Sequence, residues 1–385
     1  MEFSISKEDF LTGLSKIQGI VGRETTWPIT KNVLITTGEE EISLVATDME
    51  SYFLGTYPAR VMVPGAITIP GKKLFEVVKD FPEMEIPVTE TENGWVKISN
   101  NRLNHLLPAI SAEEFPKIPG IDKEGLMRLP TGIFNDVIQK TDLPAAGGGD
   151  DKRPYLVHLL GFYFSIFQDG ENPPVLRLVS TDGNRLSVMD HKPENPDDLL
   201  GLQFEKGVVL PKKILGDVKR LCDGEGTISM GIRSIDDGNS LFVFSRESEI
   251  LMGRLLEGEY PEYKAVIPND VKSSLTVSKK SFLPLLKRII IFTSPNFKAV
   301  NVSILPDMLK LSIKNPEIGE SQEEYSTEFD GEPFDTAFNP QYFIDALNVM
   351  KSDKVTIRLE KDKRAFLITG EEDPGYLMVI MPMRN

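Results

Sequence analysis

The feature that most constrains this chain is an internal repeat. The same short pattern ends in Asp48, in Asp182 and in Asn315, and the two spacings are 134 and 133 residues. Before each of these residues apolar and polar side chains alternate, which is the period of a half-buried strand, and Asp and Asn favour the turn that follows. The sequence therefore predicts one module of strands and turns that occurs three times.

The length of the chain agrees with three modules. Its 385 residues exceed what one hydrophobic core usually organises. The repeat places the modules at residues 1–125, 126–258 and 259–385. Because 40% of the residues are hydrophobic and 26% are charged, each module has enough apolar side chains for a core of its own.

Each module is predicted to contain two helices among many strands, which makes the fold α+β. Ser6 is expected to cap a helix over residues 4–20. Pro284 lies inside the helical pattern of residues 278–292 and predicts a kink or a delayed start there. The other expected helices cover residues 70–80, 130–140, 211–221 and 339–350, the last with Asn339 as its cap and Pro340 at its first position.

Strand patterns fill much of the remaining sequence. Two of them, at residues 156–167 and 176–188, lie in the second module, and the later one contains the best preserved copy of the repeat. The other expected strands cover residues 32–37, 42–47, 52–63, 95–99, 104–108, 227–232, 240–245, 249–255, 300–305, 308–314, 355–359, 365–369 and 376–383.

Charge is distributed unevenly between the helices and the rest of the chain. The formal net charge is -15, which taken alone argues against a polyanionic partner, because phosphate binding depends on Lys and Arg. Six helical windows nevertheless carry a net charge of +8, so the remaining residues carry -23; the windows are residues 4–16, 70–80, 130–140, 211–220, 278–288 and 339–351. Solvated lysines on helix surfaces are one explanation. If the helices share one side of the molecule, however, that side is basic and phosphate contacts concentrate there.

The cellular setting is inferred from what the sequence contains. Its single cysteine, Cys222, excludes an intramolecular disulfide and any cysteine-based zinc site, and favours a reducing compartment. The sequence has neither a secretion signal pattern nor a run of about 18 apolar residues. We therefore expect a cytoplasmic protein that holds no metal and no cofactor.

An enzymatic alternative is that Asp48 and Asp182 act as carboxylates in metal-dependent phosphoryl transfer. The sequence lacks a phosphate-binding loop and a His-Glu-x-x-His motif, and its three histidines have no ligand spacing. We therefore expect no catalytic activity.

Four motifs in order resemble those of the bacterial DNA sliding clamp family, the beta subunits of replicative DNA polymerases. They are the three-module layout, the Thr-Asp-Gly-Asn-Arg-Leu turn at residues 181–186, the segment at residues 260–268 and the C-terminal Val-Ile-Met-Pro-Met-Arg at residues 379–384. The resemblance covers the whole chain. It implies a head-to-tail homodimer in which six modules close into a ring, with the helices lining a hole that holds duplex DNA.

The resemblance also implies a pocket through which DNA polymerases, the clamp loader and repair polymerases dock by short peptides. Asn184 stands where many members of the family have His, which alters the expected peptide preference. Apolar side chains suit a desolvated site for hydrophobic anchors, and methionine adapts to several ligands. The residues that match this pocket are Leu156, Thr181, Gly183, Asn184, Arg185, Leu186, Pro261, Val266, Asn339, Tyr342, Val379, Met381, Pro382 and Met383.

Two further surfaces are expected on the same basis. Contacts with DNA are expected to be independent of base sequence. The positions that match the family's DNA contacts are Arg23, Lys79, Arg153, Tyr155 and Lys213, and the charge pattern adds Lys212, Lys279 and Lys280. The dimer contact is expected to join Ile291 and Phe292 to Leu103, Leu106 and Leu107 of a second copy. The alternative is a monomeric scaffold that binds peptides without encircling DNA.

Overall fold

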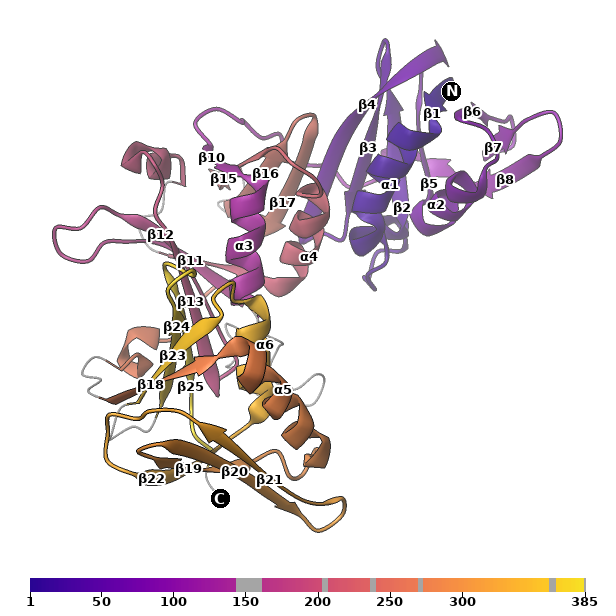
Figure 1. Ribbon diagram of the computed structural model, residues 1–385. Helices are drawn as coiled ribbons and strands as arrows, with labels where there is room; N and C mark the ends of the chain where they lie inside the picture. The colour runs from indigo at the N-terminus through magenta and orange to yellow at the C-terminus, as the bar shows by residue number, and fades with distance from the viewer. Residues whose placement is uncertain (143–160, 203–206, 236–239, 269–272, 360–364, 384–385) are drawn as a thin grey trace. The chain divides into compact units, whose positions relative to one another are not determined.

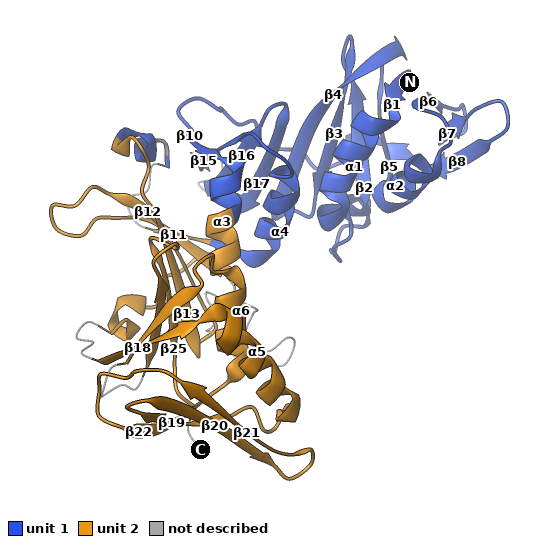
Figure 2. Cartoon of the chain, in the orientation of Figure 1, with its two compact units in different colours: residues 1–135, 197–205, 210–255 blue, residues 136–196, 206–209, 256–385 orange. Residues whose placement is uncertain are grey.

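The computed structural model describes residues 1–142, 161–202, 207–235, 240–268, 273–359 and 365–383. The fold is α+β, as expected, and the sheets are antiparallel throughout the described pairings (Figure 1). The chain forms two compact units that do not coincide with the three repeats (Figure 2). The first unit comprises residues 1–135, 197–205 and 210–255, and the second comprises residues 136–196, 206–209 and 256–385.

The first unit is built on a sheet of 13 strands. Nine strands follow one another in the order β10 (Met127–Pro130), β15 (Thr227–Ser234), β16 (Ser240–Arg246), β17 (Glu249–Arg254), β4 (Ser51–Val63), β1 (Glu2–Ser6), β6 (Glu85–Glu90), β7 (Trp95–Ser99) and β8 (Asn104–Pro108). The other four, β2 (Asn32–Thr37), β3 (Glu41–Thr47), β5 (Ala66–Pro70) and β9 (Ile110–Ser111), branch from β4 through β3.

Helix α1 (Lys7–Val21) packs on this sheet against β3 and β4. Its apolar residues recur every three or four positions, and Phe10, Leu14 and Ile17 are fully buried. Burial of each such side chain contributes about 1.5–3 kcal/mol. The Ser6 side chain accepts a hydrogen bond from the backbone N–H of Asp9, so the predicted cap is confirmed. Helices α2 (Gly71–Asp80) and α4 (Lys212–Leu221) lie against α1.

The second unit contains a sheet of eight strands and a sheet of four. The larger one has the order β14 (Val208–Pro211), β11 (Gly161–Phe167), β12 (Val175–Thr181), β13 (Arg185–His191), β25 (Tyr376–Ile380), β24 (Phe366–Gly370), β23 (Lys354–Leu359) and β18 (Ser273–Ser278). The smaller one has the order β21 (Gly319–Ser326), β20 (Met308–Asn315), β19 (Val300–Leu305) and β22 (Phe334–Phe338).

Helices α5 (Lys279–Ile289) and α6 (Pro340–Val349) pack together in the second unit. Asn339 caps α6 by accepting a hydrogen bond from the N–H of Gln341, as predicted. Helix α5 begins at Lys279 and continues through Pro284, so its start is not delayed. The remaining helix, α3 (Thr131–Thr141), begins in the first unit and ends in the second.

Successive modules are joined edge to edge by strand pairing. We call the pairing of β4 with β17 the first junction, and the pairing of β13 with β25 the second junction. In the first, Tyr52 lies opposite Met252, and in the second, Leu186 lies opposite Val379. Each pairing closes with one more backbone hydrogen bond, from Arg254 N–H to Glu50 and from Met381 N–H to Asn184. The two junctions therefore share one register, in which Asn184 corresponds to Glu50 and Met381 to Arg254.

Some of the sequence predictions were wrong. Residues 176–188 form a hairpin of β12 and β13, because the turn at residues 182–184 interrupts the single run we predicted. The predicted helix at residues 4–20 begins only at Lys7, since residues before it belong to β1. The part of the predicted strand 156–167 that precedes Gly161 lies outside the described residues. Strands β1, β5, β6, β9, β10, β14, β18, β21 and β22 were missed.

Candidate functional site

The turn between β12 and β13 is fixed by its own side chains. The Asp182 carboxylate accepts hydrogen bonds from the N–H groups of Asn184 (3.0 Å) and Arg185 (3.1 Å). The Thr181 hydroxyl donates to the carbonyl of Arg185 (2.7 Å) and accepts from Gly183 N–H. Gly183 has φ +85°, a left-handed conformation that glycine adopts without strain. The turn therefore presents Gly183 and Asn184 to solvent in one conformation.

Arg185 follows this turn, and its guanidinium is buried, with 3% of the residue exposed. Its Nε lies 2.9 Å from the Asp182 carboxylate, and one terminal nitrogen lies 2.6 Å from the Asp345 carboxylate in α6. The guanidinium also covers the ring of Tyr342, 4.4 Å from its centroid. Its charge is thus already balanced by two carboxylates. A direct contact of Arg185 with a peptide stays a prediction.

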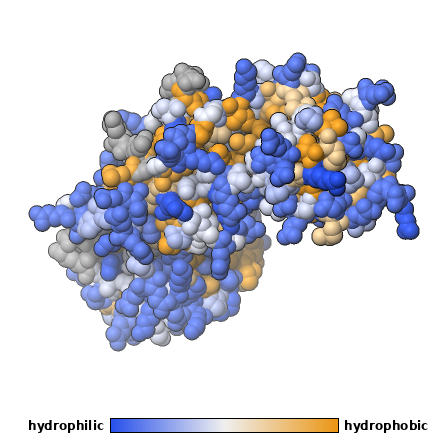
Figure 3. All heavy atoms as spheres, turned by 90° about the horizontal axis from the view of Figure 1, so that it is seen from above, coloured by the Kyte–Doolittle hydropathy of each residue, from blue (hydrophilic) through white to orange (hydrophobic). Residues whose placement is uncertain are grey.

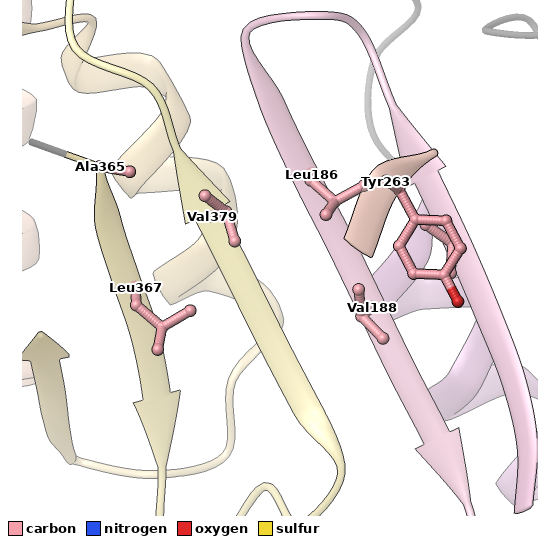
Figure 4. Close-up of a cluster of buried hydrophobic side chains, with 7 residues drawn as sticks. Leu186, Val188, Tyr263, Ala365, Leu367 and Val379 are labelled. Carbon is pink, nitrogen blue, oxygen red and sulfur yellow. The ribbon is translucent and has the colours of Figure 1, made fainter. Parts of the chain in front are cut away.

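The predicted apolar residues of the pocket meet at the second junction. Val379 on β25 lies opposite Leu186 on β13, and both are buried in a cluster with Tyr263 (Figure 4). Beyond the end of β25, Met381, Pro382 and Met383 are half-buried. Leu186 and Val379 therefore form a floor, and the three residues after β25 offer the accessible apolar surface. We call the turn 181–186, the start of α6 and residues 379–383 the seat.

The rim of the seat includes the start of α6. Tyr342 is half-buried, and its pKa is raised first by burial and then by the charge of Asp182, although a hydrogen bond with Asn339 opposes the rise. Pro261 and Val266 are exposed in the short segment whose Tyr263 packs on the floor. Leu156, the remaining predicted member of the pocket, lies outside the described residues.

The first junction repeats the turn but surrounds it with charge. The Asp48 carboxylate accepts hydrogen bonds from the N–H groups of Glu50 and Ser51, as Asp182 does for its own turn. Arg23 donates to Asp48 (2.8 Å) and to Asp217 in α4 (2.5 Å). Burial alone would lower the pKa of Arg23, but the Asp217 and Asp48 carboxylates raise it above its usual value.

The predicted DNA contacts differ in how far their charges are available. Lys79 on α2 and Lys280 on α5 are exposed. Lys213 lies against Glu50 and 3.7 Å from Asp48, and burial lowers the pKa of its amine. Lys279 donates to the carbonyl of Met350 (2.5 Å). Lys212 is half-buried, Arg23 is held by the two aspartates described above, and Arg153 and Tyr155 lie outside the described residues.

The residues predicted for the dimer contact lie near two sheet edges. Leu106 on β8 is 50% exposed, and Ile291, just after α5, is 67% exposed. On the face drawn in Figure 3, hydrophobic residues reach the surface among hydrophilic ones. Leu103 and Phe292 are half-buried. The prediction for Leu107 was wrong, because successive strand residues face opposite sides, and Leu107 is 5% exposed in the core of its own chain.

The alternative with Asp48 and Asp182 as catalytic carboxylates is not supported by their surroundings. Both residues are buried, and each carboxylate accepts two backbone N–H groups of its own turn and pairs with an arginine. These bonds hold the turns together. Within the described parts of the chain, no helix combines the length and the apolarity that crossing a membrane requires.

The fold and the junctions together define a clamp: a repeated module of two helices, joined edge to edge into continuous sheets, with an apolar edge at one junction. Family models for the DNA polymerase III beta subunit match the chain in order, with the N-terminal domain at residues 1–119, the central domain at 128–262 and the C-terminal domain at 264–384.

Relatives and solved structures agree with these matches. The beta sliding clamp of Caulobacter vibrioides is 27% identical, with full coverage of both chains. The DNA polymerase sliding clamp of Bacillus subtilis has the same fold, with a TM-score of 0.88 over 100% of this chain and 99% of that one, at 23% identity. The sliding clamp of Bartonella birtlesii, solved bound to griselimycin, has a TM-score of 0.88 and 25% identity, with full coverage of both chains.

The chain belongs to the family of the DNA polymerase III beta subunit, the bacterial sliding clamps. It is accordingly a processivity subunit for DNA replication and not an enzyme.

Proposed function

We propose that two copies of this chain close head to tail into a ring around duplex DNA in the bacterial cytoplasm. The observation that supports a ring is the way in which the edge strands of successive modules pair with one another. At both junctions the strand after the repeated turn, β4 or β13, pairs with the last strand of the next module, β17 or β25.

Two strands have no such partner among the described residues of the chain. They are the strand after the turn in the third module, and the strand of the first module that corresponds to β17 and β25. β21 follows the third turn and pairs only with β20, and β8, which in the first module precedes only the two-residue strand β9, pairs only with β7. One chain therefore offers one open edge of each kind. A second copy related by a twofold axis satisfies both at once, and the assembly closes. Leu106 beside one edge and Ile291 near the other supply exposed apolar surface for this contact.

Lysines on the helices provide the expected contact with DNA. Lys79 and Lys280 are exposed, and neither belongs to an ion pair that the described residues show. Such contacts with phosphate are individually weak and independent of sequence. A closed ring needs no tight grip, since topology prevents its escape from DNA, and weak contacts allow it to slide.

The seat at the second junction is proposed to bind the peptides of the polymerase, the clamp loader and repair polymerases. Its floor of Leu186 and Val379 and its accessible Met381 suit apolar anchors from a peptide. We propose that griselimycin, which is bound in the Bartonella birtlesii clamp structure, binds this chain at the same seat.

The ring is tested by loading the protein, with its clamp loader, onto circular DNA and onto linear DNA with free ends. We expect retention on the circle and loss from the linear molecule, together with a dimer mass in solution. Ile291→Glu should place a charge in the contact and give a monomer that is not retained, whereas Leu200→Glu, at a leucine that is also strongly exposed, should behave as the unaltered protein. A monomer mass for the unaltered chain, or equal retention on both DNAs, would favour the monomeric scaffold.

The seat is tested by calorimetry with griselimycin and with the clamp-binding peptide of the cognate polymerase. Met381→Ala removes accessible apolar surface, and we expect a loss of affinity of about tenfold. Met84→Ala, at an exposed methionine in the first unit, serves as the matched control and should bind normally. Unchanged affinity in Met381→Ala would remove the assignment.

A further inference from the structure

The two junctions share an arrangement that the repeat alone does not require: one guanidinium between two aspartates. At the first, Arg23 bridges Asp48 and Asp217. At the second, Arg185 bridges Asp182 and Asp345. One aspartate of each pair belongs to the repeated turn.

The other aspartate occupies an equivalent helix position in both junctions. Asp217 is the sixth residue of α4, and Asp345 is the sixth residue of α6. The guanidinium, in contrast, comes from different places: Arg23 follows α1, whereas Arg185 is the third residue after Asp182. Ser51 occupies that position in the first junction, and its hydroxyl accepts a hydrogen bond from Arg23 (3.1 Å). Arginines from different places in the chain thus bridge equivalent pairs of carboxylates at the two junctions.

At the second junction this bridge is part of the seat, because Asp182 and Arg185 belong to the turn 181–186. Asp345 accepts hydrogen bonds from Arg185 (2.6 Å) and from the Gln341 side chain (2.6 Å). Arg185 in turn covers the ring of Tyr342 and holds the Asp182 carboxylate, which fixes the N–H groups of the turn. The turn and the start of α6 both border the seat. They are therefore connected through the Asp345 carboxylate, which accepts a hydrogen bond from Arg185.

We propose that Asp345 is a positioning residue of the seat, which holds Arg185 against Tyr342 and so sets the distance between the turn and α6. This inference depends on the proposed binding of peptides at the seat. Asp345 itself is not proposed to touch the peptide. It acts through Arg185, whose planar guanidinium bonds two carboxylates in a fixed geometry, unlike a lysine.

The first junction supplies a matched control within the same chain. Asp217 has the same role toward Arg23, but the positions that form the seat at the second junction are different here. Glu50 stands in place of Asn184, and Arg254 stands in place of Met381. Loss of the Asp217 charge should therefore loosen the fold without affecting a ligand at the seat.

The experiment compares Asp345→Asn with Asp217→Asn by surface plasmon resonance and thermal unfolding, with griselimycin and the cognate polymerase peptide as probes. Both variants should lower the melting temperature, Asp217→Asn by more, because Asp217 is buried and also pairs with Arg220, whereas the Asp345 side chain is 21% exposed. Only Asp345→Asn should weaken binding, by about tenfold and through faster dissociation, because a loosened rim releases a bound ligand more readily. A purely structural role would affect both variants alike.

A double-mutant cycle shows whether Asp345 acts through the rim. In a Tyr342→Ala background, Asp345→Asn should cause little further loss of affinity, since the two residues form one connected unit. Additive losses would overturn the inference.

Gln341→Ala removes only the second bond to Asp345, at an exposed residue, and should reduce affinity two- to threefold even if Asp345→Asn does not fold.

The outcomes separate this inference from the proposed function. If the unaltered protein binds neither probe, binding at the seat is wrong. If it binds both, and Asp345→Asn or Gln341→Ala binds as tightly as the unaltered protein, the seat stands and the role of Asp345 is overturned.

Discussion

The first and second junctions pair their strands in the same way and each holds one arginine between two aspartates, yet only the second has the accessible apolar residues of the proposed peptide site. Both pair the strand after the turn with the last strand of the next module, in one register. Around the first turn lie Glu50, Lys213 and Arg254, whereas Met381, Pro382 and Met383 lie at the second. We infer that the arginine bridges hold each junction together, and that the accessible residues at the second junction determine the proposed ligand.

The largest effect should come from removing either bridging arginine. Arg185→Ala and Arg23→Ala each leave the buried aspartate of the turn and a second aspartate, half-buried Asp345 or buried Asp217, without their guanidinium, and each should cost about 3–5 kcal/mol of unfolding free energy. Denaturation with urea measures both, and Arg128→Ala, at an exposed arginine on β10, is the control. If one of the two changes stability by less than about 0.5 kcal/mol, as surface substitutions do, the junctions are not equivalent.

A second difference concerns the loss of folding stability at low pH, and it involves Asp373 near the second junction. Burial alone would raise the pKa of Asp373, but hydrogen bonds from Lys351 N–H, from Ser352 and from the Lys140 amine lower it to about 2. A carboxyl whose pKa is lower in the folded state stabilises the fold above its unfolded value of about 3.9, and this contribution disappears as the pH falls toward 2.

Melting temperatures measured between pH 6 and pH 2 test this expectation. The unaltered protein should lose stability below about pH 4, and Asp373→Asn should be less stable at pH 6 but show a flatter acid limb. An acid limb of unchanged slope in the variant would mean that other carboxyls control acid unfolding.

The smallest effect on the unfolding free energy should come from substitutions at the residue of each turn that has the left-handed backbone conformation. Gly183 and Met49 are equivalent, with φ +85° and +73°. Gly183→Ala should cost about 1–2 kcal/mol, because a side chain disfavours this conformation, whereas Met49→Gly should be neutral or gain less than about 1 kcal/mol. Chemical denaturation distinguishes them. A similar loss in both variants would show that side-chain packing outweighs backbone strain at these turns.

Much of the fold could be predicted from the sequence, because its signals are local. Ser6 and Asn339 cap helices where their side chains indicated, and the six α-helices among the described residues lie where apolar residues recur at helical spacing. β21 was missed since its sequence, Gly-Glu-Ser-Gln-Glu-Glu-Tyr-Ser, contains little apolar material to reveal alternation. The hairpin at residues 175–191 was predicted as one run, although its turn residues were recognised.

The candidate site was predictable in part. The turn and the C-terminal apolar residues meet as expected at the second junction. Burial separates roles that sequence cannot: Leu107 and Leu106 are adjacent leucines, but one lies in the core. The aspartates Asp217 and Asp345 were missed because their partners are distant in sequence. An alignment of the second helix of each module would have revealed them, since both stand at its sixth position.

Helix α3 has a consequence for how such a molecule could have arisen and how it should be divided. It starts in one compact unit and finishes in the other, so the segment that was copied in tandem is not the segment that folds as a body. Excising a single repeat would strip β4 or β13 of its neighbour and leave a long strand ready to associate with other chains. Ancestral forms with fewer repeats would have needed self-association to cover those strands.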